Sequence, residues 1–345
     1  MRLGDSERNA MAEAGLKEAR YWSKAETGRV QCALCPHGCR IAEGQTGLCR
    51  VRQNLQGTLR TLNYARVSAA NFDPVEKKPL FHFCPGSVIL SLGSVGCNLA
   101  CSFCQNWAIS QQDAGTRRMT PEEAVALAGR DATSIGIAYT YNEPFVWYEY
   151  VLETAGLARA GGLRNVLVTN GYVSEEPLRE MLPFIDAMNV DIKSTSDRFY
   201  RELCRGRAEP PRRTVEIAKE AGCLVEVTNL VIPNWNDSEE ALGGFIDWVT
   251  SVDPEMPVHF SRYHPDYKLT EPPTPADTLM RARDMARAKL RYVYVGNLWG
   301  GEGEDTVCGS CGKTVVERRG FAVSEIRVVG GHCEFCGGHV PIVGT

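Results

Sequence analysis

The stretch Gly96-Cys97-Asn98-Leu99-Ala100-Cys101-Ser102-Phe103-Cys104 spaces three cysteines as C-x3-C-x2-C. It follows residues 88–92, a short apolar run that predicts a parallel strand buried on both faces. Four thiolates fill the iron sites of an ordinary cubane cluster, whereas three leave one iron open to a ligand. The spacing therefore predicts a reactive 4Fe–4S cluster rather than thiols that only pack in a core. The predicted ligands and catalytic residues are Cys97, Cys101 and Cys104.

Apolar runs and amphipathic segments alternate after this stretch, which predicts an α/β fold. Strands are expected at residues 88–92, 135–139, 166–168, 188–192, 224–232, 258–263 and 292–295, with helices at 121–128, 145–160, 175–184, 211–221, 238–249 and 275–290. Six or seven such units imply a parallel sheet with right-handed crossovers, short of the eight in a closed barrel. A further, weakly amphipathic helix is expected over residues 5–24.

Two more cysteine groups flank this region. In the tail, Cys308-Gly-Ser-Cys311 and Cys333-Glu-Phe-Cys336 predict a structural zinc ribbon, although a rubredoxin-like iron uses the same ligands. Near the N-terminus, Cys32, Cys35, Cys39 and Cys49 suit zinc or an auxiliary 4Fe–4S cluster, with His37 as an alternative ligand. The remaining thiols lack partners at metal-ligand spacing and are expected in the core: Cys84, Cys204 and Cys223.

Composition narrows the setting. The 345 residues carry a formal net charge of −4, which gives no electrostatic footprint for nucleic acid. No apolar run approaches the ~20 residues that span a bilayer, and the N-terminus lacks the order of a signal peptide. Because eleven of the fourteen cysteines have metal-ligand spacing rather than suggesting disulfides, a cytoplasmic location is expected.

Four motifs occur in a specific order: Cys32-Ala-Leu-Cys35-Pro-His-Gly-Cys39, Gly47-Leu-Cys49-Arg-Val-Arg52, Pro79-Leu-Phe-His82 and Ser94-Val-Gly-Cys97 through Trp107. This order resembles the AmmeMemoRadiSam system radical SAM enzymes, a group related to pyruvate formate-lyase activating enzyme, over nearly the whole chain. The resemblance implies a partial (βα)6 TIM-like barrel of the radical SAM type at residues 85–300. An N-terminal cysteine-rich extension (1–84) and a zinc-ribbon-like tail (301–345) would flank it.

The resemblance also implies the chemistry. The open iron would chelate S-adenosylmethionine (SAM), and an electron from the cluster would split SAM into methionine and a 5′-deoxyadenosyl radical, which takes hydrogen from a substrate. Many related activases carry a further cysteine insert soon after the cluster loop, whereas this chain has no cysteine between Cys104 and Cys204. The simplest activases lack that insert too.

Ligands of such a sheet gather at the carboxyl ends of its strands, so residues there are the candidate SAM-binding groups. Glu143 lies in a segment similar to the family's Gly-Gly-Glu-Pro motif, but Tyr141-Asn142 stands where glycines often occur. Several candidates also have an interpretation without SAM. Glu143-Pro144 can simply start a helix, Asp191 and Lys193 can form a structural ion pair, and His264 can be a capped loop residue. The candidates are Phe103, Asn142, Glu143, Thr169, Asn170, Asp191, Lys193 and His264.

Three functions remain open at this point. The first is an activase that takes hydrogen from a protein glycine. The second is a radical enzyme acting on a peptide, small molecule or RNA with an auxiliary metal site. The third is a nonenzymatic zinc-ribbon binding module. Expected partners are a flavodoxin or ferredoxin as electron donor and, from the resemblance, Memo-like and AMMECR-type proteins or a glycyl-radical protein.

Overall fold

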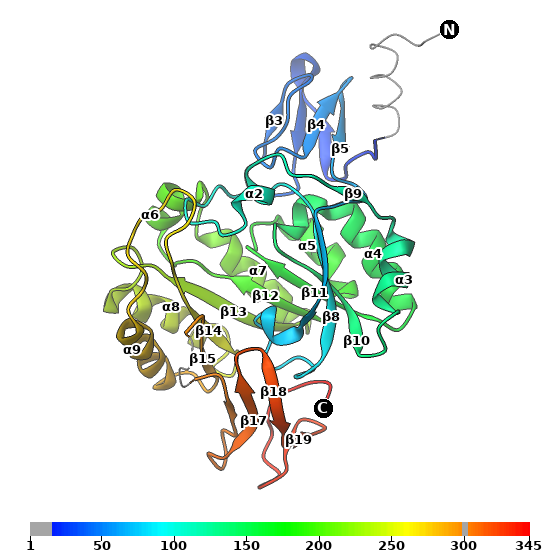
Figure 1. The fold of residues 1–345 in the computed structure, drawn as a ribbon. Coiled ribbons are helices and arrows are strands. Elements are labelled where there is room, and N and C mark those ends of the chain that lie inside the picture. The colour runs from blue at the N-terminus through cyan, green and yellow to red at the C-terminus, as the bar shows by residue number, and fades with distance from the viewer. Residues whose placement is uncertain (1–15, 299–302) are drawn as a thin grey trace.

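An eight-stranded sheet forms the centre of the computed structural model, which describes residues 16–298 and 303–345 (Figure 1). Its strand order is β15-β14-β13-β12-β11-β10-β8-β7, and all neighbours are parallel except β7 and β8. The strands are β7 (Ala69–Pro74), β8 (Val88–Gly93), β10 (Ser134–Tyr139), β11 (Arg164–Thr169), β12 (Ala187–Asp191), β13 (Leu224–Val231), β14 (Val258–Arg262) and β15 (Val293–Gly296). The order leaves β15 and β7 as edges, so the predicted partial-barrel fold is confirmed.

Helices connect the parallel strands and lie on the outside of the sheet (Figure 1). They are α3 (Pro121–Ala128), α4 (Tyr148–Ala160), α5 (Glu175–Met181), α7 (Glu209–Glu220), α8 (Glu239–Val252) and α9 (Ala276–Arg287), with the short α2 (Trp107–Ser110) and α6 (Asp197–Phe199). Short 3-10 turns precede α4 and follow α5, at Pro144–Trp147 and Leu182–Phe184. A capping box joins Thr120 and Glu123 at the start of α3, as the sequence Thr-Pro-Glu-Glu predicts.

Two elements differ from expectation. Strand β7 lies in the region assigned to the N-terminal extension, and its sequence Ala-Ala-Asn-Phe-Asp-Pro has neither an apolar run nor β-branched residues that would indicate a strand. The helix expected over residues 5–24 lies partly outside the described residues. Its last part forms the strand β1 (Trp22–Lys24) instead, because these residues pair with β2 (Val30–Cys32).

The extension and the tail lie at opposite ends of the barrel (Figure 1). The extension contains the sheet β1-β2-β3, with β3 at Arg40–Ile41, and the hairpin of β4 (Arg52–Leu55) and β5 (Thr58–Thr61). The strands β6 (Arg66–Val67) and β9 (Arg117–Arg118) pair nearby. The tail contains β16 (Thr306–Val307), β17 (Thr314–Arg319) and β18 (Ala322–Ile326) in one sheet, and β19 (Val328–Val329) paired with β20 (His332–Cys333).

A buried polar cluster joins the barrel to the tail. The Glu226 carboxylate accepts a hydrogen bond from the His82 backbone at 2.7 Å and contacts His259 Nε2 at 2.6 Å. His82 Nε2 lies 2.7 Å from Tyr294 Oη, which lies 2.8 Å from Thr306 Oγ1 in the tail. Burial lowers the pKa of His82 to about 4, so its imidazole is neutral in this cluster at pH 7.

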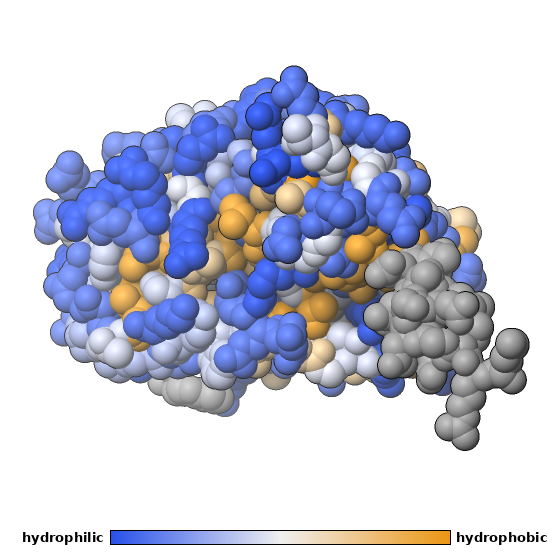
Figure 2. Space-filling view, turned by 90° about the horizontal axis from the view of Figure 1, so that it is seen from above, coloured by the Kyte–Doolittle hydropathy of each residue, from blue (hydrophilic) through white to orange (hydrophobic). Residues whose placement is uncertain are grey.

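The end of the barrel that carries the extension exposes apolar residues. Seen from this end, apolar side chains gather in a hollow across the middle of the molecule, between hydrophilic ones (Figure 2). No helix among the residues that the structure describes is long and apolar enough to cross a bilayer.

Candidate active site and metal centres

A cavity of about 440 Å³ opens at the carboxyl ends of the parallel strands. All three cysteines of the quoted stretch line it, as do six of the predicted SAM-binding residues: Phe103, Asn142, Glu143, Asn170, Asp191 and Lys193. Thr169 lies behind Glu143 instead of lining the cavity. The fold therefore brings most of the predicted residues around one space.

The loop at residues 94–106, which carries the cysteines, is held on several sides. The Asn142 side chain accepts from Ser94 N and donates to Gly96 O, both at 2.9 Å. Gly96 has φ +88°, and a Cβ there would lie 2.7 Å from Cys49 O, so this position requires glycine. The role of Asn142 in the structure is thus to fix the cysteine loop.

Cys204 lies beside this loop, a placement that sequence spacing does not reveal. It ends the π-helical turn Tyr200–Cys204, and its backbone oxygen accepts from Ala100 N at 2.9 Å. Its thiol is fully buried, and its hydrogen bond to Cys101 lowers the pKa of Cys101. The prediction of a core position is confirmed, with a cluster-site cysteine as neighbour.

Glu143 is buried and accepts three hydrogen bonds. Oε1 accepts from Phe145 N at 3.0 Å and Thr169 Oγ1 at 2.7 Å, while Oε2 accepts from Asn170 N at 2.8 Å. Burial raises the pKa of Glu143 to about 7. A carboxylate has about four acceptor positions, so one on Oε2 remains for a donor in the cavity.

The Asn170 side chain connects this carboxylate region to the cysteine loop. Its Nδ2 donates to Asn98 Oδ1 at 3.0 Å and lies 3.5 Å from Cys97 Sγ. A chain of contacts therefore leads from Glu143 through Asn170 to Cys97.

Asp191 and Lys193 form an ion pair at 3.0 Å on another wall of the cavity. Burial alone would lower the pKa of Lys193, but the nearby Asp191 carboxylate holds it well above its usual value. Lys193 Nζ also lies 5.7 Å from the centre of the Phe103 ring. The Lys193 ammonium therefore lies in the cavity wall as well as in the ion pair with Asp191.

His264 is exposed and does not line the cavity. Its Nδ1 lies 3.4 Å from Nε2 of Gln105, which does line it. The structure thus places His264 at the rim, one residue away from the space where SAM is expected.

Tyr141 occupies a position where the related motif usually has glycine. Its φ of 72° falls in the left-handed region that favours glycine. The ring is held by a hydrogen bond from Oη to Asp73 Oδ2 at 2.7 Å, and Asp73 also accepts from Lys78 Nζ at 2.7 Å. Lys77, Lys78 and Tyr141 line the cavity. Sequence reasoning missed these groups, although Lys77 and Lys78 directly precede the quoted motif Pro79-Leu-Phe-His82.

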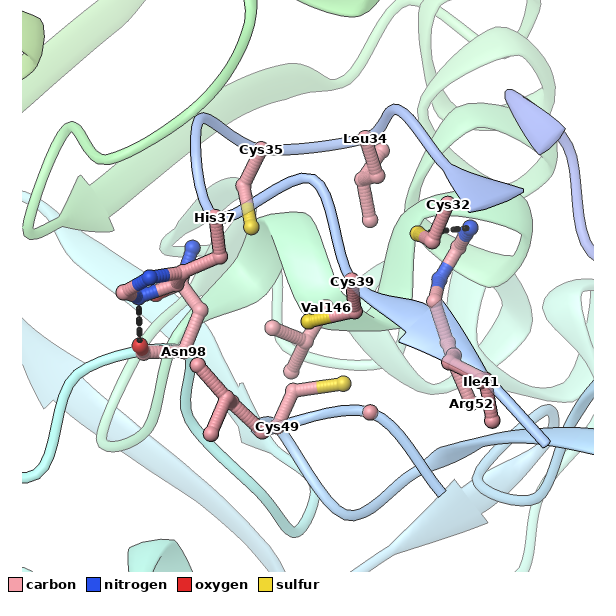
Figure 3. Close-up of a pocket in the computed structure, with 12 residues that line it drawn as sticks. Cys32, Leu34, Cys35, His37, Cys39, Ile41, Cys49, Arg52, Asn98 and Val146 are labelled. Atoms are coloured by element: carbon pink, nitrogen blue, oxygen red, sulfur yellow. Dashed lines mark hydrogen bonds between the residues drawn. The ribbon is translucent and has the colours of Figure 1, made fainter. Parts of the chain in front are cut away.

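The four N-terminal cysteines surround a second, smaller cavity of about 20 Å³. Figure 3 shows the sulfur atoms of Cys35, Cys39 and Cys49 directed into the same space, with Cys32 at its edge beside Arg52. His37 also lines this cavity, and its Nε2 contacts Asn98 O at 2.7 Å.

The four tail cysteines converge much more tightly. All four sulfur atoms lie within 4.8 Å of one another, with 3.7 Å between Cys308 and Cys336 and 3.8 Å between Cys311 and Cys333. A tetrahedral ion with metal–sulfur bonds of about 2.3 Å sets sulfur–sulfur edges of about 3.8 Å. These four side chains can therefore hold one metal ion.

A comparison with protein families matches the part of the chain that carries the three cysteines. The model of the Radical SAM superfamily matches residues 92–246, which include the three cysteines, Glu143 and Lys193. The chain thus contains the domain of the radical SAM class of enzymes, whose members use SAM and a 4Fe–4S cluster.

A more similar relative covers nearly the whole chain. An uncharacterised protein from Methanocaldococcus jannaschii is 45% identical over 336 residues, which make up 95% of this chain and 100% of that protein. The chain therefore belongs to the family of that archaeal protein, and its residues 92–246 match the Radical SAM superfamily.

Solved structures give more distant matches. A domain of pyruvate-formate lyase-activating enzyme from Bacteroides vulgatus is 16% identical with a TM-score of 0.41, covering 46% of this chain and 98% of that one. A radical SAM methyltransferase from Sphaerobacter thermophilus is 17% identical with a TM-score of 0.47, covering 90% of this chain and 86% of that one.

Proposed function

We propose that this chain is an enzyme that reductively cleaves SAM in the 440 Å³ cavity and abstracts hydrogen from a substrate. The observation that carries the proposal is the joint placement of three thiols and the Glu143 carboxylate around one space. A cluster bound by Cys97, Cys101 and Cys104 would supply the electron that splits SAM into methionine and the 5′-deoxyadenosyl radical.

The residues fit this cofactor and SAM. Three thiols that line a cavity at the strand ends match a cluster with one free iron. The remaining acceptor position of Glu143 suits the SAM ammonium, while Asn142 and Asn170 hold the cysteine loop and the carboxylate in place. Phe103, next to Cys104, offers an apolar ring for the adenine.

Replacing Glu143 with Gln tests the ammonium contact. Losing a charge-assisted hydrogen bond costs roughly 1.5–3 kcal/mol, so the dissociation constant for SAM should rise about tenfold or more. Equilibrium binding of SAM to the anaerobic, iron-loaded protein measures the effect. The iron content should stay at the wild-type value, because Glu143 is not a cluster ligand.

The matched control is Glu153→Gln, which changes a partly exposed carboxylate on α4. This variant should bind SAM as the wild type does. Unchanged affinity in Glu143→Gln would mean that the carboxylate only caps the turn at Pro144–Trp147.

We also propose that the tail metal is zinc, because a closed four-thiolate site without an open position is typical of structural zinc. Replacing Cys311 and Cys336 with Ala should remove about one zinc ion per chain while iron remains. Metal analysis of the full chain and hydrogen exchange of residues 303–345 measure the result, and exchange there should become faster. Iron rather than zinc in the wild-type tail would contradict the assignment.

The activase-like subtype rests on the sequence motifs. The substrate proposed first is a glycine of a partner protein, with a flavodoxin or ferredoxin as reductant in the cytoplasm. Memo-like and AMMECR-type proteins are the proposed associates. Anaerobic incubation with SAM, reductant and each candidate protein, followed by electron paramagnetic resonance, tests this: a glycyl-radical signal supports it, and 5′-deoxyadenosine formation without a protein radical favours a peptide, small-molecule or RNA substrate.

A further inference from the structure

The N-terminal cysteines differ from the tail cysteines in how they are spaced. The tail thiols converge on one point, and they are the only group of three or more metal-ligating side chains to do so among the described residues. The thiols Cys97, Cys101 and Cys104, which suit a cluster, are not spaced for one ion, and neither are the N-terminal four.

A void lies between the N-terminal thiols instead. Its volume of about 20 Å³ exceeds that of one water-sized sphere, about 10–15 Å³. A tetrahedral zinc site leaves no such space between its sulfur atoms, which lie about 3.8 Å apart. A cubane would widen the void, and the thiols already point toward it from different sides (Figure 3).

A buried cation borders this cavity. Arg52 is 1% exposed, and its Nη1 lies 3.9 Å from Cys32 Sγ. Its Nε has no hydrogen-bond partner, and its Nη2 pairs with the buried Glu149. Four thiolates carrying a cluster hold net negative charge, and the Arg52 Nη1 beside Cys32 Sγ supplies a buried hydrogen-bond donor that offsets part of the cost of burying it.

A short path connects this cavity to the first one. Asn98 lines the N-terminal cavity, its backbone oxygen contacts His37 Nε2 at 2.7 Å, and it directly follows Cys97 in the chain. On the other side, Leu48 lines the same cavity and is 61% exposed. The N-terminal site thus lies between the protein surface and the cysteine loop of the barrel.

We propose that Cys32, Cys35, Cys39 and Cys49 bind a second 4Fe–4S cluster that relays electrons to the site of Cys97, Cys101 and Cys104. Four thiolates for four irons leave no open iron, so electron transfer rather than substrate binding is the role that fits. One electron passes from a ferredoxin- or flavodoxin-class reductant, which is oxidised, to the N-terminal cluster and then to the barrel cluster. The N-terminal cluster returns to its oxidised state, and the electron breaks the carbon–sulfur bond of SAM. The relay rests on the proposed function, whereas the second cluster does not.

Iron, sulfide and zinc counts on the anaerobically reconstituted full chain test the cluster. Two cubanes predict about eight irons and eight sulfides per chain, together with about one zinc from the tail. The variant with Ala at Cys97, Cys101 and Cys104 should retain about four irons. After reduction it should show the electron paramagnetic resonance signal of a 4Fe–4S cluster. About four irons and two zinc ions in the wild type, with no iron in this variant, would overturn the second cluster while leaving SAM cleavage intact.

The reverse variant carries Ala at Cys35 and Cys39 and should lose about half of the iron. Its matched control is Cys223→Ala, which removes a buried thiol outside the three groups and should keep all the iron. The relay is read from the ratio of SAM cleavage driven by reduced ferredoxin to that driven by dithionite. This ratio should fall about tenfold or more in the Cys35/Cys39 variant.

The outcomes separate the two proposals. An unchanged ratio in a variant that has lost half its iron would overturn the relay. No SAM cleavage by the wild type with either reductant would overturn the proposed function, while the iron counts still decide the cluster.

Discussion

Alanine at Cys97, Cys101 and Cys104 together is expected to abolish the formation of 5′-deoxyadenosine from SAM with dithionite. These three thiols line the cavity, and the loop that carries them is fixed by Asn142 and by the backbone of Cys204. Without them no iron is held next to Glu143, so the electron has no route to the carbon–sulfur bond. Product analysis by chromatography after anaerobic turnover measures the loss.

Cys223→Ala serves as the control, because it also removes a buried barrel thiol but lies outside the cavity. It should cleave SAM at the wild-type rate. Continued product formation by the triple variant would place the reaction elsewhere in the molecule.

Arg318→Met is expected to lower the free energy of unfolding by about 3–5 kcal/mol, since it leaves a buried carboxylate without its cation. The Arg318 side chain lies 3.6 Å from the Glu76 carboxylate, and both are fully buried. It also donates to Phe81 O at 2.7 Å, which joins the tail to the barrel, and to Thr306 Oγ1 at 2.8 Å within the tail. Urea denaturation of the metal-loaded protein measures the change.

The neighbouring variant Arg319→Met provides the comparison, because Arg319 is exposed on the same strand, β17. Its effect should stay within about 0.5 kcal/mol, as is usual for surface substitutions. Equal effects of the two substitutions would mean that the buried cluster contributes nothing specific to the joint between tail and barrel.

Several parallel strands could be predicted because they contain short runs of apolar residues buried on both faces, as in the strand of residues 88–92. The edge strand β7 could not, since Asn71 and Phe72 are exposed and leave no apolar pattern. The strand β1 was hidden for a different reason: its three residues are fixed by pairing with β2, which no local propensity reveals.

Some residues of the candidate site could likewise be predicted from the sequence, and others could not. Residues directly after strands, such as Glu143 and Asn170, could be placed together because parallel strands end at one edge of a sheet. Cys204 and Lys78 reach the site through tertiary packing alone, from a π-helical turn and from the segment before β8. His264 also follows a strand, yet its side chain stays at the rim.

The polar cluster of His82, Glu226 and Tyr294 bears on how this protein can be recombined with its relatives. Thr306, Arg318 and the backbone of Pro341 complete that cluster from the tail, so the tail supplies part of the interior of the barrel. A tail grafted from a distant homologue would place different side chains against an unchanged barrel. Buried polar groups on both sides would then lose their hydrogen-bond partners. A chimera that keeps its barrel should therefore carry Glu76, His82 and Tyr294 together with the tail residues that contact them.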